Sequence, residues 1–155
     1  MMQRVRGSIL GVAAPLAPAG VEGEGASARD LPLCLAPVEA GFPTPTPDDV
    51  DRKLDLHAHL VRNPAATFFV YAHGDSMREA GIHDGDLLIV DRSAPAAHNK
   101  VVIVALDGEL TVKRLVRRSG RVLLIPENPD YPSIDITEHE HVHVWGVVTC
   151  VIHKL

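Results

Sequence analysis

The sequence predicts a mostly β fold, in which a compact domain of short strands and hairpins follows a flexible N-terminal arm. Three observations lead to this prediction. Short runs of β-branched and apolar residues follow one another after Pro64 and are separated by Gly, Asp, Asn and Pro. An Asp-Gly pair joins two of these runs, which is a hairpin signal. The residue composition also changes abruptly near Asp48.

The N-terminal region lacks the residues that build a core. Residues 1–47 contain 7 Pro, 6 Gly and 8 Ala, so that 21 of these 47 positions are stiff, turn-forming or small. Such a segment buries too little apolar surface to offset the entropy of ordering it, and we expect it not to fold alone. The alternating prolines of 43–47 favour an extended chain, at about 3.1 Å per residue, that reaches about 40 Å between Gly41 and Leu54.

The remaining elements follow in chain order. Asp48–His57 is either a short helix, capped by Asp48 or Asp49, or the end of an extended arm, and the leucine spacing does not decide between them. Strands are then expected in six runs that are rich in β-branched and apolar residues. These runs are Thr67–Ala72, Leu87–Val90, Val101–Leu106, Leu110–Val116, Arg121–Ile125 and Val142–Ile152.

Turn residues set the expected connections between the strands. Asp107–Gly108 predicts a two-residue hairpin, because Asp and Gly tolerate the positive φ angles of a type I′ turn. Ser119–Gly120 marks a second turn. The final run, which begins at His139, is expected to close the domain. Five or more short strands with few helices therefore predict one compact, mostly β domain.

Composition limits the classes of function. The 155 residues allow one domain and a tail. With 15 basic against 20 acidic residues, the chain lacks the positive surface that grips DNA phosphates, and no direct DNA binding is expected. No membrane span is expected, because proline or charge interrupts every apolar run, including Ile9–Ala14. Cys34 and Cys150 lie in unrelated contexts and are expected to be free thiols in a reducing compartment such as the cytoplasm.

The strongest chemical signal pairs a serine with a lysine. Ser76 follows the apolar run 66–72, which suits a turn at a strand end, and Lys113 lies 37 residues later in an apolar strand. Alternation puts Lys113 on the same face as Thr111 and Leu115. A hydroxyl becomes a nucleophile near neutral pH only when a base removes its proton, and a lysine serves as that base only when burial lowers its pKa. The residue types alone also fit a serine and a lysine that have no catalytic role.

Several motifs occur together in the order found in one peptidase family. Four surround the serine and the lysine: Gly74–Met77, Gly81–Ile82, Asp84–Asp91 and Gly108–Leu115. Five more are spread along the chain: Phe42–Pro45, Leu54–Leu56, Asn63–Val70, Leu124–Pro126 and Val144–Val148. Through these motifs the chain resembles the UmuD branch of the LexA-type self-cleaving peptidases over about residues 40–152. The resemblance implies a LexA/UmuD-type β domain, a homodimer and an N-terminal arm that the domain itself cuts.

The resemblance also implies roles for individual positions. Ser76 would be the nucleophile and Lys113 its general base. The cut would fall between Ala40 and Gly41, since the family cleaves after a small residue and before glycine, which lacks a Cβ and bends sharply into a cleft. The backbone N–H groups of Asp75 and Ser76 would stabilise the oxyanion. The corresponding organisation is an arm removed by self-cleavage, an extended linker and a peptidase domain: residues 1–40, 41–56 and 57–155.

The implied function is a switch in the SOS response to DNA damage. A RecA filament on single-stranded DNA would stimulate the cut, and the shortened homodimer in the cytoplasm would join a UmuC-type translesion polymerase subunit. Two alternatives stay open: a non-catalytic interaction module of the same fold that binds the polymerase or the filament, and a signal-peptidase-like protease that acts in trans. A LexA-type repressor is disfavoured, because no helix-turn-helix pattern lies upstream of the cleavage site.

No cofactor and no metal ion are expected. His139, His141 and His143 alternate on one face of the final run and raise the question of a metal site. A zinc site normally needs supporting ligands, however, and the sequence does not nominate any. We therefore expect these histidines to form the polar face of a strand.

Overall fold

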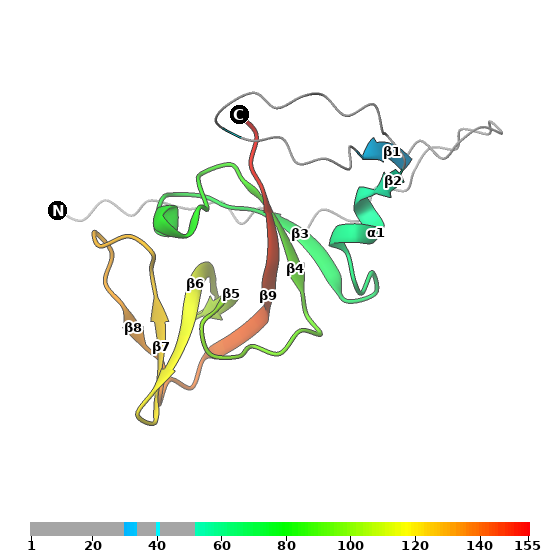
Figure 1. Ribbon diagram of the computed structural model, residues 1–155. Helices are drawn as coiled ribbons and strands as arrows, with labels where there is room; N and C mark the ends of the chain where they lie inside the picture. The colour runs from blue at the N-terminus through cyan, green and yellow to red at the C-terminus, as the bar shows by residue number, and fades with distance from the viewer. Residues whose placement is uncertain (1–29, 34–39, 41–51) are drawn as a thin grey trace.

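The computed structural model describes residues 30–33, 40 and 52–155. Most of the expected arm and linker, with Gly41 and Cys34, lies outside the described residues. Within the described residues the fold is mostly β, as the sequence predicts (Figure 1).

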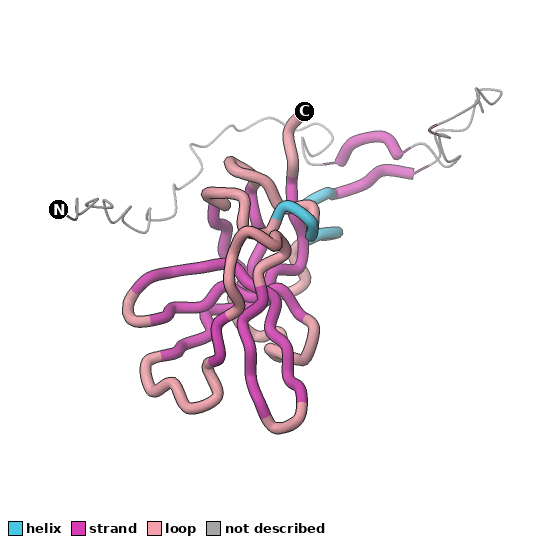
Figure 2. The backbone as a smooth tube through the Cα atoms, turned by 90° about the vertical axis from the view of Figure 1, so that its left-hand side faces the viewer, coloured by secondary structure: helices cyan, strands magenta, loops and turns pink. Residues whose placement is uncertain are grey.

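One antiparallel sheet of seven strands forms the body of the domain, in the order β3-β4-β9-β5-β6-β7-β8. Figure 2 shows that these strands splay around a common centre, with the hairpin loops pointing outward. The strands are β3 (Thr67–Tyr71), β4 (Leu87–Asp91), β5 (Lys100–Leu106), β6 (Glu109–Arg118), β7 (Arg121–Ile125), β8 (Ile134–Asp135) and β9 (Val142–Ile152).

Each of the six expected strands is confirmed to within two residues at its ends. The turn between β5 and β6 is also confirmed, because Asp107 has a φ of 51° and Gly108 a φ of 86°. The turn between β6 and β7 has the same character at Ser119 and Gly120. Sequence reasoning missed β8, which has only two residues and therefore carries no periodicity.

The final strand, β9, lies in the interior of the sheet and not at its edge. β9 pairs with β4 on one side and with β5 on the other, so it joins the two halves of the sheet and does not close an edge. Both ladders shift register along their length, at Ile89/Val90 and at Ile103/Val104. Such irregularities bend a strand and increase its twist, which explains how a single sheet curves around its own core.

Gly146 lies in β9 close to Val90 and Asp91 of β4, and we expect its replacement to destabilise the fold. A Cβ at this position would lie 2.7 Å from Val90 Cγ1 and 2.9 Å from the backbone oxygen of Asp91. The Gly146→Ala change should lower the free energy of unfolding by about 1–3 kcal/mol, because the backbone contact cannot relax by a rotamer change. Urea denaturation followed by circular dichroism measures the effect. His143→Ala, at an exposed position of the same strand, is the matched control, and equal stability of the two variants would contradict the prediction.

Buried side chains form two clusters. One lies beneath the segment that carries Ser76 and consists of Ala72, Met77, Ile82, Leu88, Val90 and Ile103. The other lies under β5, β6 and β7 and consists of Val102, Val104, Leu115, Leu124 and Val147. Lys113 and Leu115 share a face of β6, as alternation predicts, and both side chains are buried.

The segment before the sheet contains a second, two-stranded sheet and a short helix. β1 (Asp30–Leu33) pairs with β2 (Arg52–Asp55), and α1 (Leu56–Leu60) follows directly. The expected caps Asp48 and Asp49 lie outside the described residues, and α1 is capped instead by Asp55, whose carboxylate accepts the N–H of Ala58 at 3.0 Å. The described residues contain no helix long and apolar enough to cross a membrane.

Candidate active site

Ser76 lies on the loop between β3 and the 3₁₀ helix η1 (Arg78–Ala80), as the sequence predicts. The loop turns at Gly74, whose φ of 84° is a left-handed conformation that favours glycine. Met77, directly after the serine, is buried in the apolar cluster below. The buried methionine therefore anchors the loop, while Ser76 itself remains half-buried at its surface.

Lys113 reaches Ser76 from β6. Its Nζ lies 3.1 Å from Ser76 Oγ, 2.8 Å from Thr111 Oγ1 and 2.9 Å from the backbone oxygen of Val112. The structure thus brings together the two residues that sequence reasoning paired across 37 positions. Thr111, which the sequence placed on the same face as Lys113, is the third polar group of the cluster.

The surroundings of Lys113 disfavour its charged form. Only 8% of Lys113 is exposed, and this burial lowers the pKa of its ammonium group from the ordinary value of 10.5. Among the described residues, no carboxylate lies within 4.0 Å of Nζ to favour the charged state. A lysine in this setting gives up its proton more readily than one at the surface, as a general base must.

A pocket of about 170 Å³ opens beside the serine. His73, Ser76 and Thr111 are the polar residues of its lining, which also includes Gly74. Apolar side chains contribute most of the remainder: Val70, Tyr71, Ala72, Met77, Ile82, Ile103, Leu110 and Val112. The pocket suits a small apolar side chain placed next to the serine hydroxyl.

Asp75 is held by two residues that sequence reasoning missed. Asn128 Nδ2 donates to the backbone oxygen of Asp75 at 3.0 Å, and the Tyr131 hydroxyl donates to Asp75 Oδ1 at 2.6 Å. The bond to Asp75 raises the pKa of Tyr131, so that its hydroxyl keeps the proton it donates. Asn128 is 2% exposed. No local pattern connects these residues, since 53 or more positions separate them from Asp75.

Asp84 holds the other side of the serine loop. Its Oδ1 accepts the N–H of Gly74 at 2.6 Å and lies 2.8 Å from His73 Nδ1. The bond from Gly74 is the main reason that the pKa of Asp84 lies below its ordinary value. Unlike the N–H group of Gly74, the backbone N–H groups of Asp75 and Ser76 donate no hydrogen bond to another described residue.

Asn128 should position the serine, and we expect its removal to slow any reaction there. Asn128→Ala takes the donor from the Asp75 carbonyl beside Ser76, and a small displacement of a nucleophile reduces its reactivity by about 10- to 100-fold. The same change should lower the free energy of unfolding by about 1–3 kcal/mol. Self-cleavage rates, corrected for the folded fraction, measure the first effect. Tyr131→Phe, which removes only the side-chain contact, should slow cleavage less, and a wild-type rate for Asn128→Ala would contradict the assignment.

The expected cleavage site, Ala40–Gly41, is only partly described. Ala40 is exposed and Gly41 lies outside the described residues, so the position of their peptide bond relative to Ser76 stays a prediction. The expected strand face of three histidines is wrong for two of them, because β9 begins at Val142 and only His143 lies in it. His139 and His141 precede the strand; His141 and His143 are exposed, and His139 Nε2 lies 3.5 Å from Asp107 Oδ2. Among the described residues, no group of three potential metal ligands includes any of them.

A serine and a buried lysine that meet at a pocket of a β domain form the arrangement of one class of serine peptidases. The Peptidase S24-like family matches residues 32–149 of this chain, and the chain belongs to that family. The match spans both the serine loop and β6.

Named relatives agree with this assignment. The chain is 47% identical to Protein SamA of Salmonella typhimurium over 123 residues, which cover 79% of this chain and 85% of SamA. It is 44% identical to Protein MucA of Escherichia coli over 130 residues, or 83% of this chain and 88% of MucA. It is 39% identical to the LexA repressor of Cupriavidus taiwanensis over 124 residues, or 80% of this chain and 56% of the repressor. These similarities confirm the resemblance to the UmuD-type branch of the LexA-related peptidases.

Proposed function

We propose that the chain is a self-cleaving serine peptidase of the UmuD type, which cuts its own Ala40–Gly41 bond with Ser76 as nucleophile and Lys113 as general base. The observation that carries the proposal is the 3.1 Å contact between Ser76 Oγ and the Nζ of a lysine whose pKa is lowered by burial. Family membership supports a serine peptidase, and the contact supports Ser76 and Lys113 as its two reacting groups.

The three partners of Lys113 suit a neutral amine. Such an amine has two N–H bonds and one lone pair. An ammonium group would donate in all three contacts. In the neutral form that we propose, the two N–H groups donate to Thr111 Oγ1 and to the backbone oxygen of Val112, and the lone pair accepts the Ser76 hydroxyl. Thr111 therefore orients the base, and the proton of Ser76 moves to Nζ as the reaction begins.

The cut follows the two steps of acyl transfer. Ser76 Oγ bonds to the carbonyl carbon of Ala40, and the electron pair that moves to the carbonyl oxygen is met by the N–H groups of Asp75 and Ser76. Collapse of this intermediate breaks the bond to the Gly41 nitrogen, which takes its proton from the Lys113 ammonium. Water then attacks the ester of Ser76, with Lys113 as base, and the serine is restored.

The pocket and the linker support Ala40–Gly41 as the substrate. A mostly apolar pocket of about 170 Å³ beside Ser76 has room for the methyl group of Ala40. The tether makes the reaction intramolecular or within a dimer, so no extensive binding surface is needed. Glycine on the far side of the bond lets the chain leave the crowded site.

We further propose that the cut is a switch of the SOS response in the cytoplasm. A RecA filament on single-stranded DNA would stimulate it, and the homodimer of residues 41–155 would serve a UmuC-type translesion polymerase subunit. The similarity to MucA and SamA and the relation to a LexA repressor support this role. The net charge of −5 supports a protein partner and not DNA as the direct ligand.

Intact-mass spectrometry of the purified full chain, incubated at mildly alkaline pH, tests the proposal. We expect two products, residues 1–40 and 41–155, and none from the Ser76→Ala protein. Cleavage at another bond would refute the site assignment.

Two further measurements separate the alternatives. A non-catalytic interaction module would give no products, yet its Ser76→Ala form would still capture the polymerase subunit from cells. A protease acting in trans would cut an added, unlinked peptide of residues 36–45 as fast as its own arm.

A further inference from the structure

A second cluster of polar side chains lies outside the Ser76 pocket. His83 and Asp86 belong to the turn before β4, and His153 directly follows β9. One potential ligand atom from each of the three lies within 4.8 Å of the other two. Asp86 Oδ1 is 2.6 Å from His153 Nδ1, and Asp86 Oδ2 is 3.7 Å from His83 Nδ1.

The carboxylate of this cluster is fixed, while the imidazoles can adjust. Asp86 is 3% exposed, and its Oδ2 accepts the backbone N–H of His83 at 2.8 Å. The side chains of His83 and His153 are 53% and 49% exposed, and their ring centroids lie 5.2 Å apart. An ion can therefore enter from solvent and meet an oriented negative charge.

We propose that His83, Asp86 and His153 bind one divalent transition metal ion of the zinc class, with water completing its coordination. Two imidazole nitrogens and one carboxylate oxygen are ligands that zinc, nickel and copper prefer, whereas magnesium and calcium take oxygen ligands. Three protein ligands with an open position are a common zinc set.

The distances fit such an ion after small movements. A tetrahedral zinc ion with bonds of about 2.0 to 2.1 Å places its ligand atoms about 3.3 Å apart. The distances from Asp86 Oδ1 to His153 Nδ1, 2.6 Å, and from Asp86 Oδ2 to His83 Nδ1, 3.7 Å, lie on either side of this value. The three ligand atoms lie within 4.8 Å of one another, so a pair at that limit would have to approach by about 1.5 Å, which two half-exposed imidazoles allow. His83 Nδ1 makes no hydrogen bond to a described residue, although it faces the buried carboxylate, and a metal ion would give it a partner.

Metal binding would tie the turn at His83–Asp86 to the end of β9. The same turn bonds to the start of the serine loop, since Ala72 donates to the Asp86 backbone oxygen at 2.8 Å and Gly85 donates to the Ala72 oxygen at 2.9 Å. A bound ion would thus stabilise a part of the fold that supports the Ser76 loop. The sequence predicted no metal, because His83 and His153 lie far apart along the chain and belong to no spacing motif.

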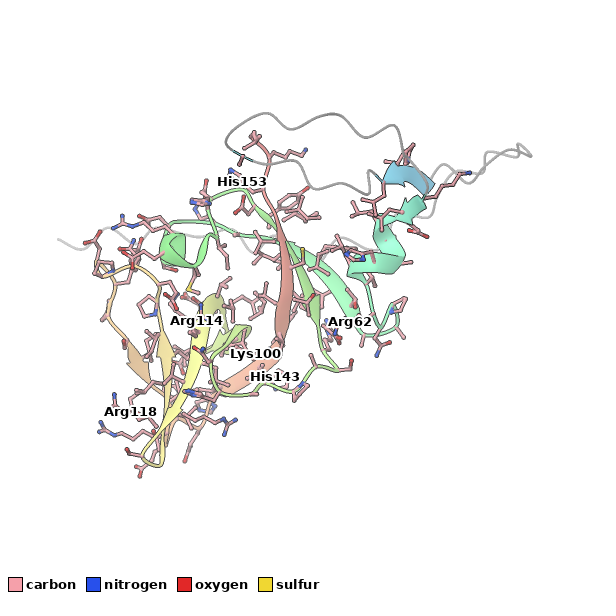
Figure 3. All side chains as sticks on the ribbon, in the orientation of Figure 1. Arg62, Lys100, Arg114, Arg118, His143 and His153 are labelled. Atoms are coloured by element: carbon pink, nitrogen blue, oxygen red, sulfur yellow. The ribbon has the colours of Figure 1, made fainter. Side chains whose placement is uncertain are left out.

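Calorimetric titration with zinc chloride tests the site on the full-length Ser76→Ala protein, which should stay uncut and whose zinc binding does not depend on the proposed reaction. We expect one zinc ion per chain. The pair His83→Ala/His153→Ala should weaken binding by about 100-fold or more, because it removes two direct ligands. His141→Ala/His143→Ala is the matched control, since it removes two exposed histidines near the other end of β9, where Figure 3 labels His143, and it should bind as the parent does.

A second measurement distinguishes the loss of a metal ligand from misfolding of the variant. Zinc should raise the melting temperature of the parent and of the control, because a ligand that binds only the folded state stabilises it. It should leave that of His83→Ala/His153→Ala unchanged, and matching circular dichroism spectra without zinc would show that this variant folds. The proposal would be overturned if the parent did not bind one zinc ion per chain, or if the two double variants lost zinc affinity equally.

Discussion

Lys113→Ala should abolish self-cleavage, lowering its first-order rate constant by on the order of 10⁴-fold or more. The reason is that Lys113 Nζ is the one basic group within hydrogen-bond distance of Ser76 Oγ among the described residues. Without it the hydroxyl proton has only water to accept it. Ser76→Ala should lower the rate constant by a similar factor, because the two residues act in the same step and the loss of either one prevents it.

Matched controls make this result specific. Lys100→Ala removes a lysine from the neighbouring strand β5, and Ser133→Ala removes an exposed serine near β8. Both should cleave at the wild-type rate. The measurement is the loss of intact chain with time, read by gel or mass, with circular dichroism to show that each variant is folded. A Lys113→Ala protein that still cuts at Ala40–Gly41 would remove the lysine from the mechanism.

A second substitution at Lys113 separates a catalytic role from a role in packing. Lys113 is buried, so its truncation leaves a cavity and lowers stability as well. Lys113→Met keeps most of the volume and removes only the amine. If Lys113→Met folds as well as the wild type and still fails to cleave, the loss is chemical. Recovery of cleavage in Lys113→Met would instead assign the residue a structural role.

Local sequence signals predicted most of the sheet. Asp107–Gly108 specified its hairpin because the turn type depends on two adjacent residues. The six strands were recognisable because alternation and β-branched residues are properties of short segments. β8 was missed because two residues are too few to show a strand pattern. Its pairing of Ile134 with Leu124 depends on β7, a different segment of the chain.

The site was predictable where chemistry itself restricts the residue type. A serine that needs a base and a lysine in an apolar strand form a chemical pair, and the motifs around Ser76 and Lys113 that resemble the UmuD branch distinguished them from an ordinary serine and lysine. Asn128 and Tyr131 could not be found in this way, because an amide and a phenol that position a backbone carbonyl are chemically ordinary. Only the fold brings them to Asp75, and the same holds for His153 and Asp86.

The rate of self-cleavage should rise with pH and reach a plateau below pH 10.5, the ordinary pKa of a lysine. The sign follows from burial, which favours the neutral amine and so lowers the pKa of Lys113. Below that pKa the fraction of neutral amine, and with it the rate, increases about tenfold per pH unit. First-order rate constants measured over a series of buffers give the profile. Lys113→Arg, whose guanidinium stays protonated, should not cleave at any of these pH values.

The same titration should appear in the stability of the Ser76→Ala protein, which should stay uncut. Lys113 has its lowered pKa only when folded, and in the unfolded chain it titrates near 10.5. Between these two values the unfolded chain binds more protons than the folded one, so the free energy of unfolding attributable to Lys113 should rise with pH. Urea titrations of Ser76→Ala and Ser76→Ala/Lys113→Met isolate this contribution, because all other groups are shared. Parallel pH dependences in the two proteins would mean that Lys113 titrates alike in both states, and that burial does not supply the base.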